Sequence, residues 1–202
     1  MQLKNIALLG ILIPLLALAE PLKFPLQLKE KTFNFKAENL TISMMVPKDL
    51  HETYIKNPVL DSYTYSGDEN RFQVNLQLIN PSKRSYQEII NGKFKEIILK
   101  PFSDKENNLY GEVEILKDDQ KGPDKIFEYQ GYLKKPQDGF TTDLYSLIHE
   151  VYLFKYDQII KANCIVQGRQ QEILITKEIF NLVKGSCKTI IDSVKISKLK
   201  KK

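Results

Sequence analysis

The sequence predicts an α+β protein in which helices pack on an antiparallel β-sheet. Apolar and polar residues alternate with a period of two in several segments, as expected for strands with one covered face and one wetter face. Two other segments repeat apolar residues at helical spacing. The order of these segments is strands, helix, strands, helix, which favours an antiparallel sheet over a parallel α/β fold. The chain of 202 residues has 42% apolar and 27% charged residues, which suits one globular domain.

The N-terminus has the three-part layout of a secretory signal peptide. Lys4 supplies a positive charge, an apolar run extends from Ile6 to Leu18, and Ala17-Leu18-Ala19 forms a small-residue cleavage site. We expect cleavage between Ala19 and Glu20, and export to the periplasm or the extracellular space. An uncleaved membrane anchor is the alternative, although the run is short for a bilayer span. No transmembrane segment is expected after cleavage.

The remaining chain divides into three parts. Residues 20–37 look like an extended N-terminal lead-in with prolines, in which Phe33 and Phe35 suggest a short strand. Residues 38–196 are expected to form a single domain. Residues 197–202 form a basic tail, which is expected to be solvated rather than a binding element.

Strands and helices of the domain follow from local patterns. Period-two alternation predicts strands over 40–46, 72–78 and 127–133, and 112–116 is a further short candidate. Richness in β-forming residues predicts strands over 143–156 and 159–166. Residues 48–70 are mixed, with a turn signal at 66–68, and Asp157-Gln158 suggests a hairpin, with a bulge as the alternative.

Two helices are expected on these strands. Ser85 and Glu88 have the spacing of a capping box at the start of a helix that runs to residue 99. Thr176 is the expected N-cap of a closing helix over 176–193, whose apolar residues recur every three or four positions.

The two cysteines, Cys164 and Cys187, fall on inward faces. Cys164 belongs to the apolar face of a strand, and Cys187 belongs to the apolar stripe of the closing helix. An even number of cysteines in an exported protein permits one disulfide, and we expect these two to be bridged. Two free thiols in the core are the alternative.

Residues suited to catalysis are few. The chain has two histidines, and neither has the spacing of a metal site. His51 stands beside Glu52 and near Asp49, and would join a metal or acid–base site or else lie on a surface loop. His149 is expected to be a partly buried strand residue. No catalytic, cofactor-binding or metal-binding residue is therefore assigned, and no cofactor is expected.

The charge pattern argues against nucleic acid as a partner. The formal net charge is +5, and the basic residues are mostly scattered lysines among acidic residues. A nucleic-acid interface would combine basic residues with stacking aromatic residues on one face, and the sequence has no such stripe.

The overall pattern resembles the PsbP/Mog1-like superfamily. The matching segments are LTISMMVPKDL (40–50), RFQVNLQLI (71–79), SYQEIINGKFKEIILK (85–100), KIFEYQGYL (125–133), EVYLFKYDQIIKANCIVQG (150–168) and TKEIFNLVKGSCKTIIDSVKI (176–196). This resemblance implies an α-β-α sandwich around an antiparallel sheet. It also implies a non-catalytic role, because members are accessory subunits, partner-binding proteins and envelope proteins. The long connection over 51–70 departs from the compact pattern.

These observations lead to two functional hypotheses. The first is an exported, non-catalytic binding or accessory protein of the bacterial envelope or secretome. It would act through a surface or shallow pocket on an unknown protein or envelope component, and a carrier of a small apolar ligand is a variant of it. The second is an exported hydrolase whose site lies near His51.

Overall fold

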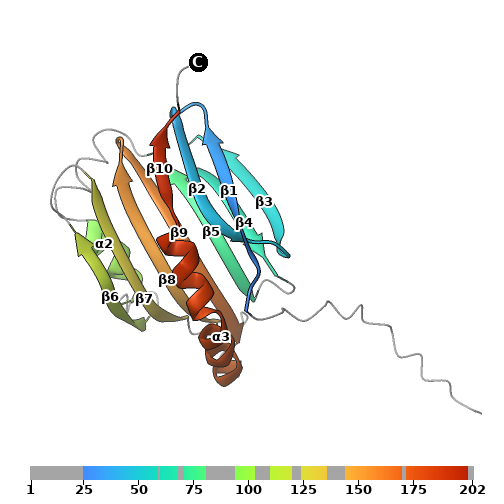
Figure 1. The fold of residues 1–202 in the computed structure, drawn as a ribbon. Helices are drawn as coiled ribbons and strands as arrows, with labels where there is room; N and C mark the ends of the chain where they lie inside the picture. The colour runs from blue at the N-terminus through green and yellow to red at the C-terminus, as the bar shows by residue number, and fades with distance from the viewer. Residues whose placement is uncertain are drawn as a thin grey trace, which may run out of the picture.

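Over the residues that it describes, the computed structural model consists of two antiparallel sheets and two α-helices (Figure 1). The structure describes residues 25–58, 60–67, 71–80, 94–102, 110–119, 124–135, 144–169 and 172–199. A three-stranded sheet has the order β1 (Leu28–Phe35), β2 (Leu40–Pro47), β10 (Lys195–Lys198). A seven-stranded sheet has the order β3 (His51–Asn57), β4 (Leu60–Ser66), β5 (Phe72–Ile79), β9 (Gln158–Arg169), β8 (Leu144–Lys155), β7 (Lys125–Lys135), β6 (Tyr110–Asp119).

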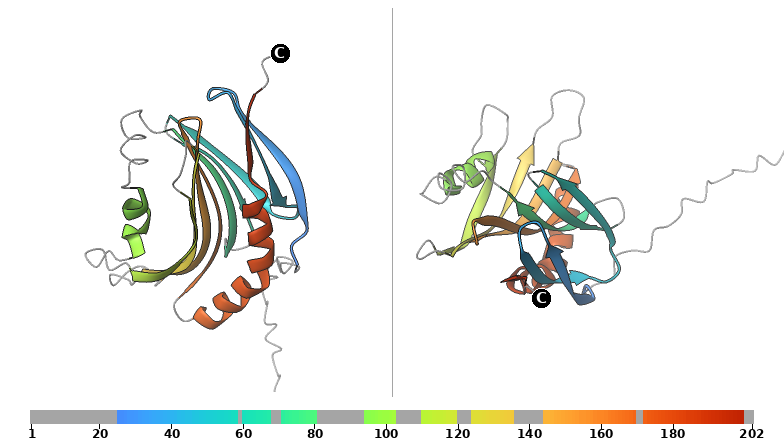
Figure 2. Two further views of the ribbon diagram at one scale, coloured as in Figure 1. Left: turned by 60° about the vertical axis from the view of Figure 1, so that its left-hand side comes forward. Right: turned by 90° about the horizontal axis from the view of Figure 1, so that it is seen from above.

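The two faces of the seven-stranded sheet are covered by different elements. The three-stranded sheet and α3 (Ile173–Asp192) lie on one face, which we call the α3 face (Figure 2). Helix α2 (Phe94–Leu99) and the 3-10 turn η3 (Lys100–Phe102) lie on the opposite face, which we call the α2 face. The antiparallel α+β class predicted from the sequence is therefore confirmed.

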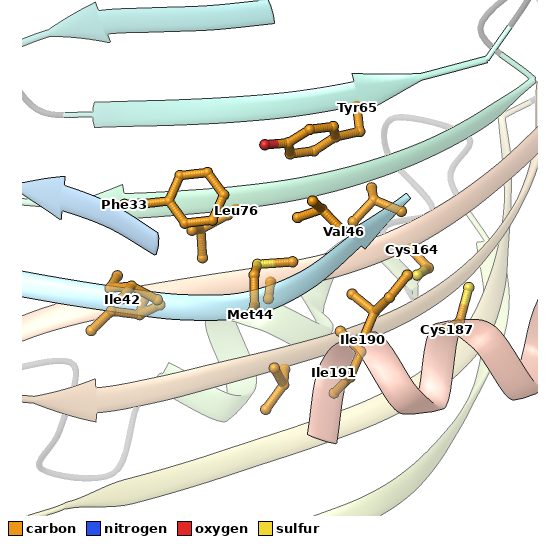
Figure 3. Close-up of a cluster of buried hydrophobic side chains, with 14 of the residues drawn as sticks. Phe33, Ile42, Met44, Val46, Tyr65, Leu76, Cys164, Cys187, Ile190 and Ile191 are labelled. Atoms are coloured by element: carbon orange, nitrogen blue, oxygen red, sulfur yellow. The ribbon is translucent and has the colours of Figure 1, made fainter. Parts of the chain in front are cut away.

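The main core fills the space between the seven-stranded sheet and the elements on its α3 face. Alternate residues of β5 and β9 enter it, and the three-stranded sheet and α3 contribute the opposite wall. Figure 3 shows Leu76 and Cys164 on the large sheet, Met44 on the small sheet, and Cys187 and Ile190 on the helix. A smaller core on the α2 face is built around Phe102, Phe127, Tyr129, Phe154 and Ile159.

Most strands expected from alternation are present, and several are longer than expected. The turn between β8 and β9 consists of Tyr156 and Asp157, both with positive φ (54° and 59°), as in the type I′ turns that match strand twist. The hairpin suggested at Asp157-Gln158 is thus present, with its turn one residue earlier.

The closing helix begins earlier than expected. It starts at Ile173, with Glu172 in the N-cap position, so the assignment of Thr176 as N-cap is wrong. The Thr176 hydroxyl instead donates to the carbonyl oxygen of Glu172 inside the first turn, at 2.9 Å. A buried Thr hydroxyl can bond back to the carbonyl four residues earlier, and its sequence signal resembles that of a cap.

Three strands lie in segments whose residue pattern does not predict a strand. Strands β3 and β4 form a hairpin within the mixed stretch 48–70, and β10 follows α3 at the start of the basic tail. The expected lead-in also contributes β1, whose Phe33 and Phe35 are buried. Every residue of β3 is exposed, so its sequence lacks the apolar alternation by which a strand is predicted.

Some expectations concern residues that the structure does not describe. These are the signal peptide (1–19), the capping box at Ser85 and Glu88, and the end of the tail after residue 199. Within the described residues, no helix has the length and apolar character needed to cross a membrane.

Candidate functional site

A groove of about 480 Å³ runs between the C-terminal half of α3 and strands β6, β7 and β8 on the α3 face. Its lining residues are Glu114, Leu116, Lys117, Glu128, Gln130, His149, Lys184, Gly185, Lys188 and Asp192. An adjoining hollow of about 280 Å³ shares Glu114 and Gln130 and reaches Leu147 and Phe180. We call these two hollows together the α3 groove.

Strand register and helix periodicity place these side chains together. Gln130 lies opposite His149 across the β7–β8 pair, and Glu128 lies two residues along β7, so all three point to the α3 face. Lys184, Lys188 and Asp192 are spaced by four residues and form one stripe of α3. Gly185 leaves this wall open, because a Cβ atom built there would meet nothing within 4 Å.

His149 and Glu128 form a buried pair in the floor of the groove. The Nε2 atom of His149 lies 2.8 Å from Oε1 of Glu128, and the histidine is only 3% exposed. The carboxylate holds the imidazole ring through this nitrogen. The other ring nitrogen, Nδ1, is buried and has no hydrogen-bond partner. A buried polar atom without a partner is uncommon in folded proteins.

The charged residues of the groove are unequally paired. Lys188 binds Asp192 at 2.7 Å, and Gln130 donates to Glu114 at 3.0 Å. Lys117 and Lys184 make no ion pair within the part of the chain that the structure describes. Over the described residues, the α3 groove therefore has two ammonium groups without an ion pair in a lining that also contains the carboxylates of Glu114, Glu128 and Asp192. Such ammonium groups are suited to binding anionic groups on a ligand.

A second polar cluster lies on the α2 face and is fully paired. The Glu150 carboxylate accepts hydrogen bonds from Tyr129 (2.7 Å) and Asn163 (2.7 Å), and Lys161 lies 2.8 Å from it. Asn163 in turn accepts from Asn75 at 2.8 Å. These bonds join β7, β8, β9 and β5 across the middle of the sheet. We call these residues the Glu150 cluster, and we interpret it as a structural network that stabilises the strand register and not as a ligand site.

The two tyrosines beside Glu150 stay protonated. Burial raises the pKa of Tyr129 and of Tyr152 far above the usual range, and the negative charge of Glu150 adds to this effect. The tyrosine hydroxyls therefore act as hydrogen-bond donors to the carboxylate at any physiological pH.

The residues singled out from the sequence have different outcomes. His51 lies exposed on β3, at the edge of the sheet opposite to β6 and the α3 groove. Over the described residues, no group of three or more His, Cys, Asp or Glu side chains is placed to hold a metal ion. His149 is a buried strand residue, as expected, but its partner Glu128 was not recognised. Glu128 and His149 lie on the same face of neighbouring strands, so a prediction that β7 pairs with β8 would have placed them near each other.

Comparisons with known proteins give structural matches alone. No family model and no curated protein matches the chain. The Ran-binding protein Mog1p of Saccharomyces cerevisiae is similar over 86% of this chain and 97% of its own, at 10% identity and a TM-score of 0.42. Cyanobacterial PsbP (CyanoP) of Synechocystis is similar over 83% and 92%, at 8% identity and a TM-score of 0.46.

A third similar structure is LpqN of Mycobacterium tuberculosis, described as involved in cell envelope biogenesis. It covers 85% of this chain and 92% of its own, at 12% identity and a TM-score of 0.39. Mog1 and PsbP, after which the superfamily that the sequence resembles is named, are both among the similar structures. The likeness concerns the fold.

Proposed function

We propose that this protein is an exported, non-catalytic binding protein that holds an extended segment of a partner protein in the α3 groove. The observation that carries the proposal is the α3 groove itself, whose lining combines the buried His149–Glu128 pair with Lys117 and Lys184. Ligand sites commonly combine a concave surface with a small number of convergent polar groups.

The shape and lining of the groove favour a polypeptide segment. The two hollows follow α3 from Phe180 to Asp192 on one side and the edge strand β6 on the other. Both signs of charge occur along this path, and Leu116, Leu147 and Phe180 supply apolar contact. An extended chain can place acidic side chains at Lys117 and Lys184 while its backbone follows the edge strand.

Binding is favoured over catalysis by the chemistry of the lining. Among the described residues that line the two hollows, none carries a hydroxyl nucleophile other than Tyr132. His149 is held by Glu128 deep in the floor, where it can anchor a ligand group. The alternative of a hydrolase near His51 has no supporting observation, since that side chain is exposed on an edge strand.

Export is the second part of the proposal. It rests on the signal peptide pattern of residues 1–19, and the first strand of the domain begins at Leu28. Cleavage after Ala19 would therefore leave every described element intact. N-terminal sequencing of the mature protein should begin at Glu20. A mature protein that retains Met1 would contradict export by this route.

Site-specific photo-cross-linking in the native cell tests the groove. A benzophenone side chain at position 185 has open space around it, whereas the same probe at Lys177 stands on the same helix outside the groove. We expect the probe at position 185 to form an adduct with one defined polypeptide, and the Lys177 probe to form none. The double variant Lys117→Glu, Lys184→Glu should reduce the adduct at 185.

Other adducts would contradict the proposal. Equal labelling at positions 185 and 177 would mean that the groove is not the contact surface. An adduct with the mass of a lipid or glycan would mean that the groove holds an envelope component instead of a protein.

A further inference from the structure

Strand β3 is an exposed edge of the seven-stranded sheet. It pairs with β4 without a register shift over seven residues, and no described strand pairs with its other side. All of its residues are exposed, including the large apolar side chains Tyr54 (46%) and Ile55 (54%). Natural proteins usually protect such edges with bulges, prolines or charged side chains. Strand β3 has neither a bulge nor a proline, and its charged residues are Glu52 and Lys56, which have opposite signs and lie two residues on either side of Tyr54.

We propose that β3 is a homodimer interface, at which a second copy of the chain pairs with it in the antiparallel direction about Tyr54. In this register Tyr54 faces Tyr54 of the second copy, and Thr53 faces Ile55. Glu52 faces Lys56, and by symmetry Lys56 faces Glu52, so the two ends of the strand carry complementary charges. Opposite charges placed directly across an antiparallel pair stabilise it.

This register is singled out by the sequence of the strand. Shifting the second copy by two residues in either direction keeps the faces of the sheet matched but removes both charge pairs. Shifting it by one residue would place side chains of the α3 face opposite side chains of the α2 face. Pairing about Tyr54 is the one register that keeps both the faces and the charges complementary.

Contacts within one copy prepare the interface. Tyr54 stacks on Tyr63 with ring centroids 4.4 Å apart, which holds its ring on the α3 face. Glu52 is held by Lys31 and Tyr65, and Lys56 lies 3.6 Å from Asp61 with its side chain largely exposed. Lys56 of the second copy would thus add a second cation to Glu52. The paired surface is small, so the dimer should be weak and concentration-dependent.

This inference is separate from the proposed function. Strands β3 and β6 are opposite edges of the sheet, so a dimer through β3 leaves the α3 groove open. Failure of one proposal therefore does not decide the other.

The first experiment inverts the charge at one end of the strand and then mixes the two charge-inverted variants. Association of the mature protein is measured by sedimentation equilibrium. Concentrations reach about 0.5 mM, because small interfaces bind weakly. The wild type should show a monomer–dimer equilibrium. Lys56→Glu alone, and Glu52→Lys alone, should each weaken dimerisation about tenfold, because each creates two like-charge pairs. An equimolar mixture of the two variants should recover the wild-type affinity, since the heterodimer pairs Glu with Lys at both ends.

Two outcomes of this experiment would overturn the proposal. One is a wild type that stays monomeric over the whole concentration range. The other is a mixture of the two variants that associates no better than either variant alone. Glu52→Lys also removes contacts with Lys31 and Tyr65, so its circular dichroism and melting temperature are compared with those of the wild type.

Cysteine cross-linking provides a second experiment that does not depend on Glu52. Tyr54→Cys lies on the two-fold axis, so its thiol should form a covalent dimer on mild oxidation. Lys56→Cys is the matched control on the same face of the same strand, and it would lie roughly 13 Å from its counterpart at 3.3 Å per residue. Equal cross-linking at positions 54 and 56, or none at 54, would exclude this register.

Discussion

The thiol of Cys164 on β9 lies against the thiol of Cys187 on α3, inside the core that joins the sheet to the helix (Figure 3). Both residues are free cysteines here, and both are fully buried. Burial raises the pKa of the Cys164 thiol well above its usual value, and the neighbouring thiol of Cys187 adds to this. The Cys164 thiol is therefore poorly suited to nucleophilic chemistry at neutral pH.

We predict that this pair forms a disulfide in the exported protein. An oxidising compartment would convert the two thiols into a bridge that closes a loop of roughly twenty residues, worth about 3 kcal/mol in the free energy of unfolding. Alkylation under denaturing, non-reducing conditions should label neither cysteine, and reduction should lower the melting temperature. Complete labelling of both thiols before reduction would show that the cysteines stay free.

The packing of α3 against the sheet leads to a second prediction. Ile190 is fully buried in the main core, whereas Leu182 on the same helix is 57% exposed. Ile190→Ala should lower the free energy of unfolding by about 2–5 kcal/mol, because it removes a large buried side chain and leaves a cavity. Leu182→Ala is the matched control and should cost under about 0.5 kcal/mol. Similar losses in urea denaturation for both variants would mean that the helix packs through another face.

The elements found from the sequence are those that bury one face. Strand β5 alternates apolar and polar residues along its whole length, because one face enters the main core, and α3 shows an apolar stripe for the same reason. Strand β3 is exposed throughout and lies at a sheet edge, so its residues record no burial pattern. A regular pattern of apolar residues arises where one face of an element is buried, so an element with no buried face has no such pattern in its sequence.

The candidate site was less accessible to sequence reasoning. Cys164 and Cys187 were placed on inward faces, which the structure confirms, because each belongs to a regular apolar pattern. Glu128 and His149 lie on different strands 21 residues apart, and their contact depends on the register of β7 with β8. No local sequence pattern specifies that register, so neither the buried pair nor the α3 groove could be predicted from the sequence.

The Glu150 cluster leads to a third prediction. Glu150→Leu removes the common acceptor of Tyr129, Asn163 and Lys161, and leaves the buried Tyr129 and Asn163 donors without this partner. The free energy of unfolding should fall by about 1–3 kcal/mol, as for buried donors left unsatisfied. Glu112→Leu, on edge strand β6, is the control and should have little effect in chemical denaturation. A Glu150→Leu protein as stable as the wild type would show that the cluster does not hold the sheet together.

The contact between the two sheets leads to a prediction about pH. Partial burial opposes ionisation of Glu52, but hydrogen bonds from Lys31 and Tyr65 outweigh it and lower the pKa of the carboxyl below 4.5. A lowered pKa in the folded state means that the stabilisation is complete above pH 4.5 and is lost as the pH falls through the lowered value. Glu52→Gln should therefore lower the melting temperature at pH 7 and have a smaller effect at pH 3. If the difference in melting temperature between the wild type and Glu52→Gln were larger at pH 3 than at pH 7, the pKa of Glu52 would not be lowered in the folded protein.

The open wall of the α3 groove leads to the last prediction. Gly185 lies inside α3, and a Cβ atom there would meet nothing within 4 Å, so Gly185→Ala should stabilise the protein by about 0.5–1 kcal/mol through helix propensity. Gly168 is the matched control, because a Cβ atom there would lie 2.1 Å from Oγ1 of Thr176 at the start of the same helix. Gly168→Ala should therefore lower the melting temperature while Gly185→Ala raises it. A loss of stability at position 185 comparable to that at 168 would mean that the groove is closed at this point and has no room for a ligand.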